Sequence, residues 1–464
     1  MAAHLHLSSP FSTGLPLKSP RRPRRIPSRS SLPAPVSARS VGRPLRAAII
    51  GGGPAGSSAA EALAAAGVET YLIERSLAGS KPCGGAIPLC MLDEFSIPAH
   101  LVDRRVTSMR ILSPSNLAVD FGRTLRPGEH IPMLRREVLD AFLRSRAQSR
   151  GAHLLPGLFT SLEPPSSLSS GEPYLIHYTS SPAPGALAGT PSTLAIDVVV
   201  GADGANSRVA RSISAGTYSS AIAFQERIRL PPEKMAHYED LAEMYVGSDV
   251  SPDFYGWVFP KCDHVAVGTG TVMSKTEIKK YQAGIRARAW SKIAGGEVIK
   301  VEAHPIPEHP RPRRVVGRVA LVGDAAGYVT KCSGEGIYFA AKSGRMCGEA
   351  IARIWNDNSK DVVTEEDLKR EYLRKWDREY LWMFRFLDLL QRVFYGSNAA
   401  KEALVELCGD EYVQRMTFES YLYKRMAVGD WRKDLGLVWR TVGSLAKAGI
   451  MGKEVERLRT LAEC

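Results

Sequence analysis

The chain has 464 residues, enough for two or three domains, and a formal net charge of +13 at pH 7. The charge falls to about +4 when the nine Lys and Arg of residues 1–46 are left out, which removes the main support for nucleic-acid binding. The seven cysteines have no CxxC spacing and no run of about 18 apolar residues occurs, so we expect no metal site, no disulfide framework and no transmembrane helix.

Residues 1–46 have the composition of a targeting segment. They contain nine Ser and eight Pro but no Asp or Glu, and the first acidic residue of the chain is Glu61. This composition is typical of an organelle transit peptide, and its Pro and Ser content favours the chloroplast over the mitochondrion. We predict a transit peptide that stays outside the fold. A basic arm that remains attached and binds an acidic partner is the alternative.

The next segment predicts a dinucleotide-binding βαβ unit. An apolar run at 45–50 predicts a buried strand, an Ala-rich stretch at 54–66 predicts a helix, and the glycine-rich turn 51–56 joins them. Such a turn presents backbone N–H groups and the positive end of the helix dipole to a pyrophosphate. A second strand at 68–73 ends at Glu74, where an acidic side chain would hold a ribose hydroxyl. The predicted cofactor-binding residues are Gly51, Gly53, Ala55, Gly56 and Glu74.

Two later segments repeat the pattern of a buried strand that ends in a small-residue turn with one carboxylate. They are 201–208, which contains Asp203, and 322–327, which contains Asp324 and Gly327. Together with the first turn they resemble the glutathione-reductase-type FAD enzymes of the para-hydroxybenzoate hydroxylase group. The resemblance implies that FAD is the cofactor and that Asp324 binds the flavin ribityl chain, with Gly327 in the same site. Asp203 is either a cofactor ligand or a turn residue, since turns favour Asp.

The stretch between the first two segments contains a Gly- and Pro-rich loop at 81–88 and a predicted amphipathic helix at 137–147. Arg136 precedes this helix and matches the arginine that the FAD enzymes place near the cofactor phosphates, with Arg135 as a competing alignment. The segment 164–191 is rich in Ser, Pro, Gly and Ala, which predicts a surface hairpin or loop rather than a core element.

Short β-like runs dominate residues 221–300 and predict an antiparallel substrate domain inserted at about 216–305 into a discontinuous FAD-binding domain at 47–360. The Pro-rich stretch that follows is expected to return the chain to the cofactor domain, with His304 and His309 on a linker surface rather than as ligands. The predicted fold class is α/β, or α+β overall, with a glutathione-reductase-type, Rossmann-like FAD-binding domain.

Residues 361–464 predict a mainly helical C-terminal region. Between residues 365 and 394, five apolar residues recur at intervals of three and four, which predicts a helix with one apolar face. Packing of this face on the catalytic domain is the favoured interpretation, and a lid over a lipid chain or a membrane-facing surface is the alternative. The five residues are Leu373, Trp376, Tyr380, Phe384 and Leu387.

Two features between the FAD segments are distinctive. They are Cys83-Gly84-Gly85 and the sequence Tyr-Gly-Trp-Val-Phe-Pro-Lys at 255–261, which is followed by Gly268 and Gly270. They resemble the geranylgeranyl reductase family, whose substrate domain carries a Tyr-x-Trp-x-Phe-Pro signature before a glycine pair. The resemblance covers nearly all of the chain after residue 46. It implies NADPH-dependent reduction of three of the four double bonds of a geranylgeranyl chain, free as the diphosphate or esterified to chlorophyll.

The signature predicts a pocket for the prenyl chain. Tyr255, Trp257 and Phe259 alternate along one strand, so their side chains share a face and would form an apolar wall. Gly268 and Gly270 are predicted to belong to the same pocket. An ordinary sheet core is the alternative interpretation of this aromatic strand.

Each reduced double bond needs a hydride from the flavin and a proton on the other alkene carbon. Cys83 and Tyr255 are the candidate catalytic residues. The Pro-Cys-Gly-Gly setting of Cys83 lets its sulfur approach a flavin closely, but Tyr255 or bound water would serve equally well as the proton donor, and an inert buried thiol is a further alternative. NADPH is the expected reductant, without a Rossmann domain of its own.

The resemblance also implies a setting and partners. Geranylgeranyl diphosphate and geranylgeranyl-chlorophyll are the expected ligands, in chlorophyll and in tocopherol and phylloquinone synthesis, in the chloroplast stroma or at the thylakoid surface. Chlorophyll synthase and a light-harvesting-like anchor protein are the expected partners. The rival functions are another FAD monooxygenase or a polyene cyclase on the same scaffold and, from another class, a non-catalytic isoprenoid or chlorophyll carrier that retains FAD.

Overall fold

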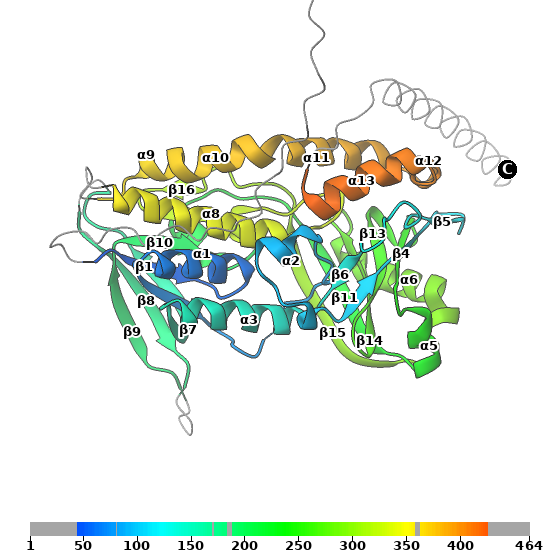
Figure 1. Cartoon of the computed structure of the whole chain (residues 1–464), viewed down its shortest axis with the longest axis horizontal. Helices are drawn as coiled ribbons and strands as arrows, with labels where there is room; N and C mark the ends of the chain where they lie inside the picture. Colours follow the sequence, from blue (N-terminus) through cyan, green and yellow to red (C-terminus); the bar gives the residue numbers. More distant parts are fainter. Residues whose placement is uncertain (1–43, 80, 169–170, 183–187, 358–361, 426–464) are drawn as a thin grey trace, which may run out of the picture. The chain divides into compact units, whose positions relative to one another are not determined.

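The computed structural model describes residues 44–425, apart from residues 80, 169–170, 183–187 and 358–361. The predicted transit peptide therefore lies outside the described residues except for its last three, and so does the part of the helical region beyond residue 425. The described chain contains two large β-sheets and the helices that cover them (Figure 1).

The first sheet has eight strands, of which the five central ones run parallel. In spatial order the strands are β16 (Val315–Val316), β17 (Val319–Leu321), β10 (Val198–Gly201), β1 (Arg46–Ile50), β2 (Glu69–Glu74), β7 (His153–Glu163), β8 (Tyr174–Ser180) and β9 (Pro191–Ile196). Strands β1, β10 and β17 are almost entirely buried and apolar, as expected of a parallel sheet covered on both faces. The strands predicted at 45–50 and 68–73 are confirmed within one residue.

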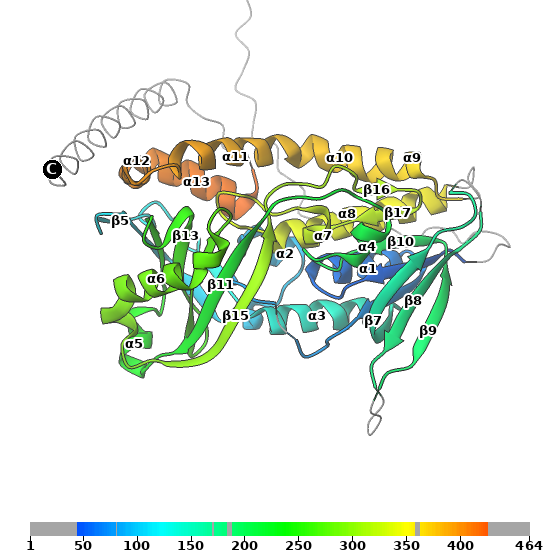
Figure 2. The same ribbon diagram turned by 180° about the vertical axis from the view of Figure 1, so that it is seen from behind.

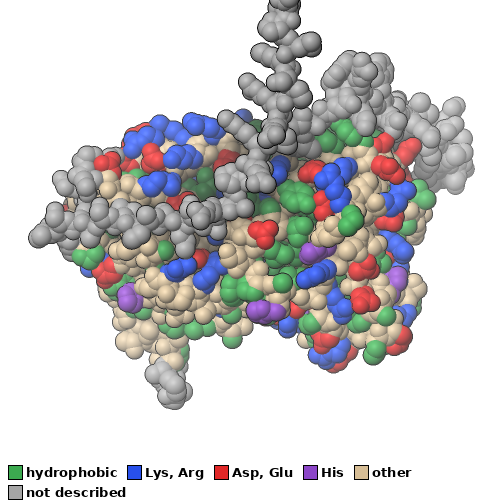
Figure 3. All heavy atoms as spheres, in the orientation of Figure 1, with side chains coloured by type: hydrophobic (Ala, Val, Ile, Leu, Met, Phe, Trp, Pro, Cys, Tyr) green, Lys and Arg blue, Asp and Glu red, His purple; other side chains and the backbone are tan. Residues whose placement is uncertain are grey.

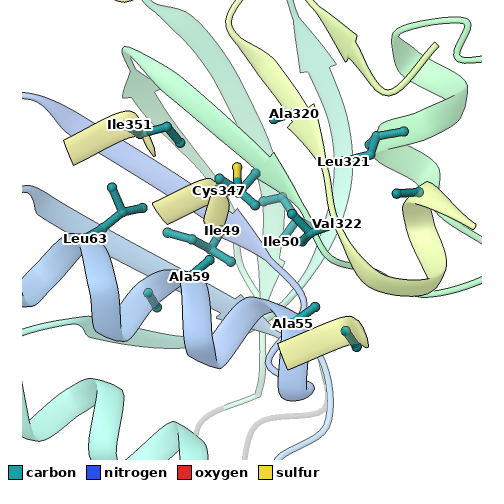
Figure 4. Close-up of a cluster of buried hydrophobic side chains, with 14 of the residues drawn as sticks. Ile49, Ile50, Ala55, Ala59, Leu63, Ala320, Leu321, Val322, Cys347 and Ile351 are labelled. Carbon is teal, nitrogen blue, oxygen red and sulfur yellow. The ribbon is translucent and has the colours of Figure 1, made fainter. Parts of the chain in front are cut away.

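Helices α1 (Pro54–Ala65) and α8 (Ile337–Asn356) pack side by side on this sheet, and α3 (Arg136–Ser149) contacts α1. A Cβ at Gly344 of α8 would overlap the carbonyl oxygen of Ala55, so the two helices approach this closely only because the residue is glycine. Figure 4 shows apolar side chains of α1, α8 and the neighbouring strands filling the interface. This packing fixes the start of α1, and with it the glycine turn, against the sheet.

The second sheet has seven strands and is antiparallel except between β12 and β4. In spatial order the strands are β15 (Glu297–Pro307), β11 (Ser220–Arg229), β14 (His264–Thr271), β13 (Ser251–Pro260), β12 (Leu241–Gly247), β4 (Ser108–Leu112) and β5 (Ala118–Asp120). Helix α6 (Ile278–Ile293) packs on one face. Because β4 and β5 precede the predicted insertion at 216–305, two separate stretches of the chain build this sheet.

The described part of segment 164–191 contains strand β8, which forms antiparallel hairpins with β7 and β9; the predicted hairpin is therefore present, but the expectation that it contributes no core element was wrong. Strand β8 pairs with β7 on one side and β9 on the other, and the side chains of Tyr174 and Ile176 are buried. The flanking Ser, Pro and Gly residues dominated the composition, whereas the strand itself reads Tyr-Leu-Ile-His-Tyr-Thr-Ser, a run that favours a β-strand and whose first three side chains are alternately buried and exposed.

Helices follow one another from residue 365 to residue 423. They are α9 (Glu365–Leu368), two π-helical stretches (Lys369–Leu373 and Asp377–Leu381) on either side of α10 (Arg374–Trp376), then α11 (Trp382–Phe394), α12 (Asn398–Cys408) and α13 (Glu411–Tyr423). In both views the run from α9 to α11 extends from the first sheet to the second (Figures 1 and 2). Among the described residues, no helix combines the length and apolar character needed to cross a membrane.

The apolar stripe of this helical run packs on the first sheet's helices and also reaches a cavity. Trp376 stacks on Tyr328 with 4.2 Å between ring centroids, and Phe384 lies edge-on to Phe339 at 5.3 Å. Leu387 instead lines the large cavity described below. The favoured interpretation of the stripe as a packing face is confirmed, and part of it also forms a cavity wall.

The remaining described elements are short. They are α2 (Cys90–Glu94), the 3₁₀ turns Ala99–Leu101 and Lys275–Glu277, the paired strands β3 (Arg104–Val106) and β6 (Ile131–Met133), α4 (Arg208–Ser212), α5 (Pro232–His237) and α7 (Gly323–Ala326). On the face drawn in Figure 3, Lys and Arg side chains are interspersed with Asp and Glu, and hydrophobic side chains gather near the middle.

Candidate active site

A cavity of about 1390 Å³ extends from the glycine turn of β1 and α1 to the inner face of the second sheet and helices α11 to α13. The loops at 81–86 and 329–337 complete its lining. Pockets for a single small ligand commonly have volumes of about 300–1,000 Å³. The cavity is therefore large enough for a dinucleotide together with a second, elongated ligand.

The glycine turn allows a phosphate group to approach the backbone. Gly51 has a φ of +106°, and a Cβ at this position would overlap the carbonyl oxygen of Ala202 in the second FAD segment. A Cβ at Gly56 would overlap the carbonyl oxygen of Gly51, so α1 requires glycine there. Gly53 faces open space, because an added Cβ would meet only Arg136, at 3.7 Å. Helix α1 has no side-chain N-cap, which leaves its first N–H groups to a ligand.

Glu74 lies at the carboxyl end of β2 and lines the cavity beside this turn, as does Ala55. Its Oε2 accepts a hydrogen bond from the N–H of Gly52 at 2.6 Å, and its Oε1 accepts one from the N–H of Ser76 at 2.8 Å. Arg144 of α3 donates to the Gly52 carbonyl at 3.1 Å. These bonds hold the carboxylate next to the turn, the position that a ribose-binding role requires.

Asp324 lies in the first turn of α7, where it lines the cavity and forms an ion pair with Lys81. Burial raises the pKa of Asp324, but the charge and hydrogen bond of the Lys81 ammonium, together with the nearby Arg136, hold the pKa below its usual value. The carboxylate is therefore ionised at neutral pH and can accept hydrogen bonds from hydroxyl groups. Gly327 does not line the cavity; it ends α7 with a φ of +86° and lies against the carbonyl group of His309.

His304 also lines the cavity, which corrects its prediction as a linker surface residue. It belongs to β15 and pairs with Ala223 of β11. Its Nε2 is buried and has no hydrogen-bond partner among the described residues, and burial together with Lys81 lowers its pKa to about 3. The neutral imidazole is therefore available to a ligand. Sequence reasoning missed it because Pro305 and Pro307 concealed the strand, although an edge strand accepts proline.

Of the two competing arginines, Arg136 faces the cavity. Its buried guanidinium donates two hydrogen bonds to Asp140, at 2.9 and 2.7 Å, and this pairing fixes its orientation. Arg135 pairs with Asp103 at 3.1 Å instead. The geometry therefore favours the alignment that gives Arg136 the phosphate-binding role.

Asp203 acts as a turn residue in this structure. Its carboxylate accepts hydrogen bonds from the Ser207 hydroxyl at 2.5 Å and from the N–H groups of Arg208 and Val209 at 2.6 and 3.2 Å, at the start of α4. Burial raises the pKa of Asp203. Three donors already bind this carboxylate, so stabilisation of the turn before α4 explains why an aspartate occurs here. Asp203 also lines the cavity.

The residues at this end of the cavity fit FAD. Asp324 and Glu74 offer carboxylates to hydroxyl groups, and Gly53 leaves space for a pyrophosphate. Basic side chains of the lining provide positive charge for the phosphates. They are Arg75, Lys81, Arg136, Arg144 and Arg208.

The other end of the cavity is apolar and elongated. Tyr255, Trp257 and Phe259 of β13 line it, and Phe254 stacks on Tyr255 with 4.3 Å between ring centroids. Side chains from the C-terminal helices form the facing wall; they include Leu390, Phe394, Leu404, Leu407, Phe418 and Tyr421. The aromatic strand is therefore both a buried sheet element and the wall of an open pocket, whose length suits an extended chain.

Gly268 and Gly270 do not line the cavity. They lie on β14 behind the aromatic strand, where a Cβ at Gly268 would come within 2.5 Å of the Trp257 ring and one at Gly270 within 3.1 Å of the Phe254 ring. The glycine pair therefore shapes the pocket indirectly, since it leaves room for the aromatic rings that form the wall.

The Cys83 loop packs directly on the aromatic strand. A Cβ at Gly84 would lie 2.7 Å from the ring of Phe259, and Gly85 has a φ of +74°. The Lys261 ammonium, at the end of the same strand, donates to the Gly84 carbonyl. Cys83 is half-buried and lines the cavity. The structure thus brings together the two sequence features that distinguish this chain from other flavoproteins.

One group of adjacent metal-binding residue types occurs in the described part of the chain, at Cys262, Asp263 and His264. The Asp263 carboxylate already contacts the His264 ring at 2.8 Å and Arg229 at 3.3 Å. The exposed Asp263 carboxylate in this hairpin turn is thus shared by two basic side chains. We therefore do not interpret these three residues as a metal site.

A parallel sheet with a glycine turn, and two later strand ends that converge on the same cavity, define an FAD-dependent oxidoreductase of the glutathione-reductase type. Residues 45–81 match a family model described as an FAD binding domain. The fold is also that of a geranylgeranyl bacteriochlorophyll reductase-like protein from Thermoplasma acidophilum, with a TM-score of 0.67 and 20% identity over 82% of this chain and 97% of that one.

Closer relatives define the family. The chain is 63% identical over 416 residues to a chloroplastic geranylgeranyl diphosphate reductase of Arabidopsis thaliana, across 90% of this chain and 88% of the relative. It is 59% identical over 408 residues to a geranylgeranyl diphosphate reductase of Synechocystis, across 88% of this chain and 99% of the relative. The chain belongs to the geranylgeranyl diphosphate reductase family.

We expect the Asp324→Asn variant to bind FAD about 10- to 100-fold more weakly, because hydrogen bonds to a charged group contribute about 1.5–3 kcal/mol. Titration of the apoprotein with FAD, followed by quenching of flavin fluorescence, measures the affinity. Asp203→Asn is the matched control: it weakens a cap of α4 and should lower thermal stability more than FAD affinity. Equal FAD affinity in wild type and Asp324→Asn would contradict the assignment of Asp324.

Proposed function

We propose that the protein is an NADPH-dependent flavoprotein that reduces three of the four double bonds of a geranylgeranyl chain. It would form phytyl diphosphate from geranylgeranyl diphosphate, or phytylated chlorophyll from geranylgeranyl-chlorophyll, for chlorophyll, tocopherol and phylloquinone synthesis. The observation that carries the proposal is the continuity of the cavity, which joins the FAD-binding residues to an elongated apolar pocket. Family membership supports the same reaction.

The chain's own residues orient the substrate. Isolated alkenes have no polar group near the reacting carbons, so the apolar wall of Tyr255, Trp257 and Phe259 must place each double bond by shape. When bound and reduced, FAD supplies a hydride for one carbon of each double bond. The half-buried loop at 81–86 and the helices α11 to α13 enclose the reacting region and limit access of water.

Cys83 is the better candidate for the group that protonates the second carbon. The Tyr255 hydroxyl donates to the Ser333 carbonyl at 2.7 Å, and burial raises the pKa of Tyr255, so both its hydrogen bond and its acidity oppose proton release. Cys83 lines the same cavity on a loop that touches the aromatic strand. We therefore assign Cys83 as the catalytic acid and Tyr255 to positioning of the loop that contains Ser333.

The names of the relatives support a chloroplast setting for the reaction. The Arabidopsis relative is named a chloroplastic enzyme, and we place this protein in the chloroplast as well. Within it, we propose the stroma with peripheral attachment to the thylakoid, where chlorophyll synthase and a light-harvesting-like anchor protein are the expected partners. Attachment through a partner fits a prenyl substrate that itself partitions into the membrane.

We expect anaerobic incubation with FAD, NADPH and either prenyl substrate to give a product that has gained six hydrogens, as measured by mass spectrometry. The reaction needs no oxygen because NADPH supplies all the electrons. Stalling without oxygen would favour a monooxygenase, and an isomer of unchanged mass would favour a polyene cyclase. Bound FAD that NADPH and substrate fail to cycle would favour a carrier, and each of these outcomes would overturn the proposal.

A further inference from the structure

We infer that Lys261 is a positioning residue for proton transfer, and that its buried ammonium acts through Cys83 by holding the Cys83 loop and stabilising the thiolate left after proton donation. The inference rests on the proposed function, because it assumes that Cys83 is the acid of an alkene reduction. Lys261 does not line the cavity and so would not touch the substrate.

The backbone around Lys261 is fixed on both sides. It follows β13 directly, and its N–H donates to the carbonyl of His264 across the hairpin at 2.8 Å. Its own carbonyl accepts a hydrogen bond from Arg104 at 2.8 Å. The residue is only 3% exposed. The side chain therefore extends from a rigid strand end toward the Cys83 loop.

The ammonium of Lys261 ends beneath this loop. It donates to the carbonyl of Gly84, and a Cβ at Gly85 would overlap its Nζ. The N–H of Gly85 in turn lies 3.4 Å from the Cys83 sulfur, which accepts its hydrogen bond. One side chain thus determines where the loop backbone lies, and the loop backbone orients the thiol.

The ammonium has no carboxylate of its own. Among the described residues, no carboxylate lies within 4.0 Å of Lys261, and the two acids that interact with it electrostatically are engaged elsewhere: Asp103 pairs with Arg135 at 3.1 Å and Glu137 with Arg227 at 3.0 Å. A buried charge without a counter-ion is costly, and burial lowers the pKa of Lys261 to about 8. An anion on the neighbouring Cys83 would supply the missing counter-ion.

The groups around Cys83 on other elements do not replace Lys261 in this role. Arg136 of α3 is the other cation that interacts with Cys83, but it is bound to Asp140. Tyr255 of β13 and Tyr421 of α13 also interact with it, and burial raises the pKa of both, so they stay neutral. Among these groups, Lys261 is the cation without its own counter-ion.

Every proton and electron pair is accounted for when Cys83 protonates the alkene carbon. The S–H bond of Cys83 breaks, its proton forms the new C–H bond, and the electron pair stays on sulfur as a thiolate beside the Lys261 ammonium. Once the product has left, water in the cavity returns a proton to the sulfur, since Cys83 lines the cavity whereas Lys261 does not. With a pKa of about 8, Lys261 is largely protonated at neutral pH and so keeps the positive charge that stabilises the thiolate.

The test compares the alkylation of Cys83 by iodoacetamide across a pH series in Lys261→Gln and wild type, with modified peptides quantified by mass spectrometry. Glutamine keeps a donor for the Gly84 carbonyl but removes the charge. We expect the alkylation profile to move up by about one pH unit, the size of shift that a neighbouring opposite charge produces. Lys261→Met should shift it at least as far, and Lys261→Arg should restore most of the reactivity.

Lys401→Met is the matched control, because Lys401 is also buried, has a pKa lowered by burial to about 8 and donates to the carbonyls of Ser251 and Pro252. It should leave the Cys83 profile unchanged. In a Cys83→Ala background, Lys261→Gln should cause no further loss of kcat. An unchanged profile in folded Lys261→Gln would overturn the inference, as would failure of both neutral variants to fold while Lys401→Met folds.

The alkylation result separates this inference from the proposed function. If the protein reduced no prenyl chain, the product assay would fail while the alkylation profile could still depend on Lys261. If Lys261 had only a structural role, the product would still gain six hydrogens and the profile would not move.

Discussion

The Cys83→Ala variant is expected to lower kcat for prenyl reduction by about 10²- to 10⁴-fold, the range that general acid catalysis contributes. The substitution removes only the sulfur, which lines the cavity and packs, half-buried, against the edge of the first sheet's hydrophobic core. FAD should therefore remain bound, and single-turnover measurements should show slow oxidation of the reduced flavin by substrate. Retention of wild-type kcat with normal FAD content would overturn the assignment.

Two controls separate the candidate donors. Cys332 also lines the cavity, but burial raises its pKa to about 11, so Cys332→Ala should leave kcat nearly unchanged. Tyr255→Phe removes the hydrogen bond to the Ser333 carbonyl and should lower kcat only a few-fold if Cys83 is the acid. A loss in Tyr255→Phe as large as that in Cys83→Ala would instead favour Tyr255.

The Gly56→Ala variant is expected to lose about 3 kcal/mol or more of unfolding free energy, because the added Cβ would overlap the Gly51 carbonyl oxygen. Relief of this overlap requires α1 to move away from the glycine turn, so bound FAD should be lost as well. Urea unfolding monitored by circular dichroism measures the stability, and flavin absorbance of the purified protein measures the cofactor content.

Gly53→Ala is the matched control for this prediction. In the protein an added Cβ would meet only Arg136, at 3.7 Å, so stability should fall by no more than about 1 kcal/mol, the cost of a poorer N-cap residue. The methyl group would nevertheless stand where a pyrophosphate approaches, and FAD affinity should drop at least about tenfold. Similar stability losses in both variants would contradict the separate roles given to the two glycines.

At the FAD site, consecutive residues were enough to predict the secondary structure but not the contacts of every side chain. The turn at 51–56 could be predicted because its strand, turn and helix are consecutive, and the strands at 45–50 and 68–73 formed as expected. The sequence favoured Arg136 and left Arg135 as a competing alignment, because neighbouring residues at the start of a helix point in different directions. The ion pairs with Asp103 and Asp140 support Arg136.

The reaction end of the cavity depended more strongly on tertiary structure. The aromatic alternation of 255–259 predicted a shared face, and that face lines the cavity. The sequence did not predict that His304 lines the cavity. Its proline-containing stretch forms an edge strand only because β11 lies beside it. The glycines at 268 and 270 were assigned to the pocket but lie behind it, where they make room for aromatic rings.

The sequence by itself determined the cofactor class and the resemblance to prenyl reductases, since both depend on short motifs whose geometry is set by a few consecutive residues. The tertiary structure decided which side chains meet. Lys261 and Gly84 are separated by 177 positions, yet one hydrogen bond joins them. Such a contact follows from the packing of a loop of the first domain on a strand of the second sheet, and strand register and burial over the whole fold determine that packing.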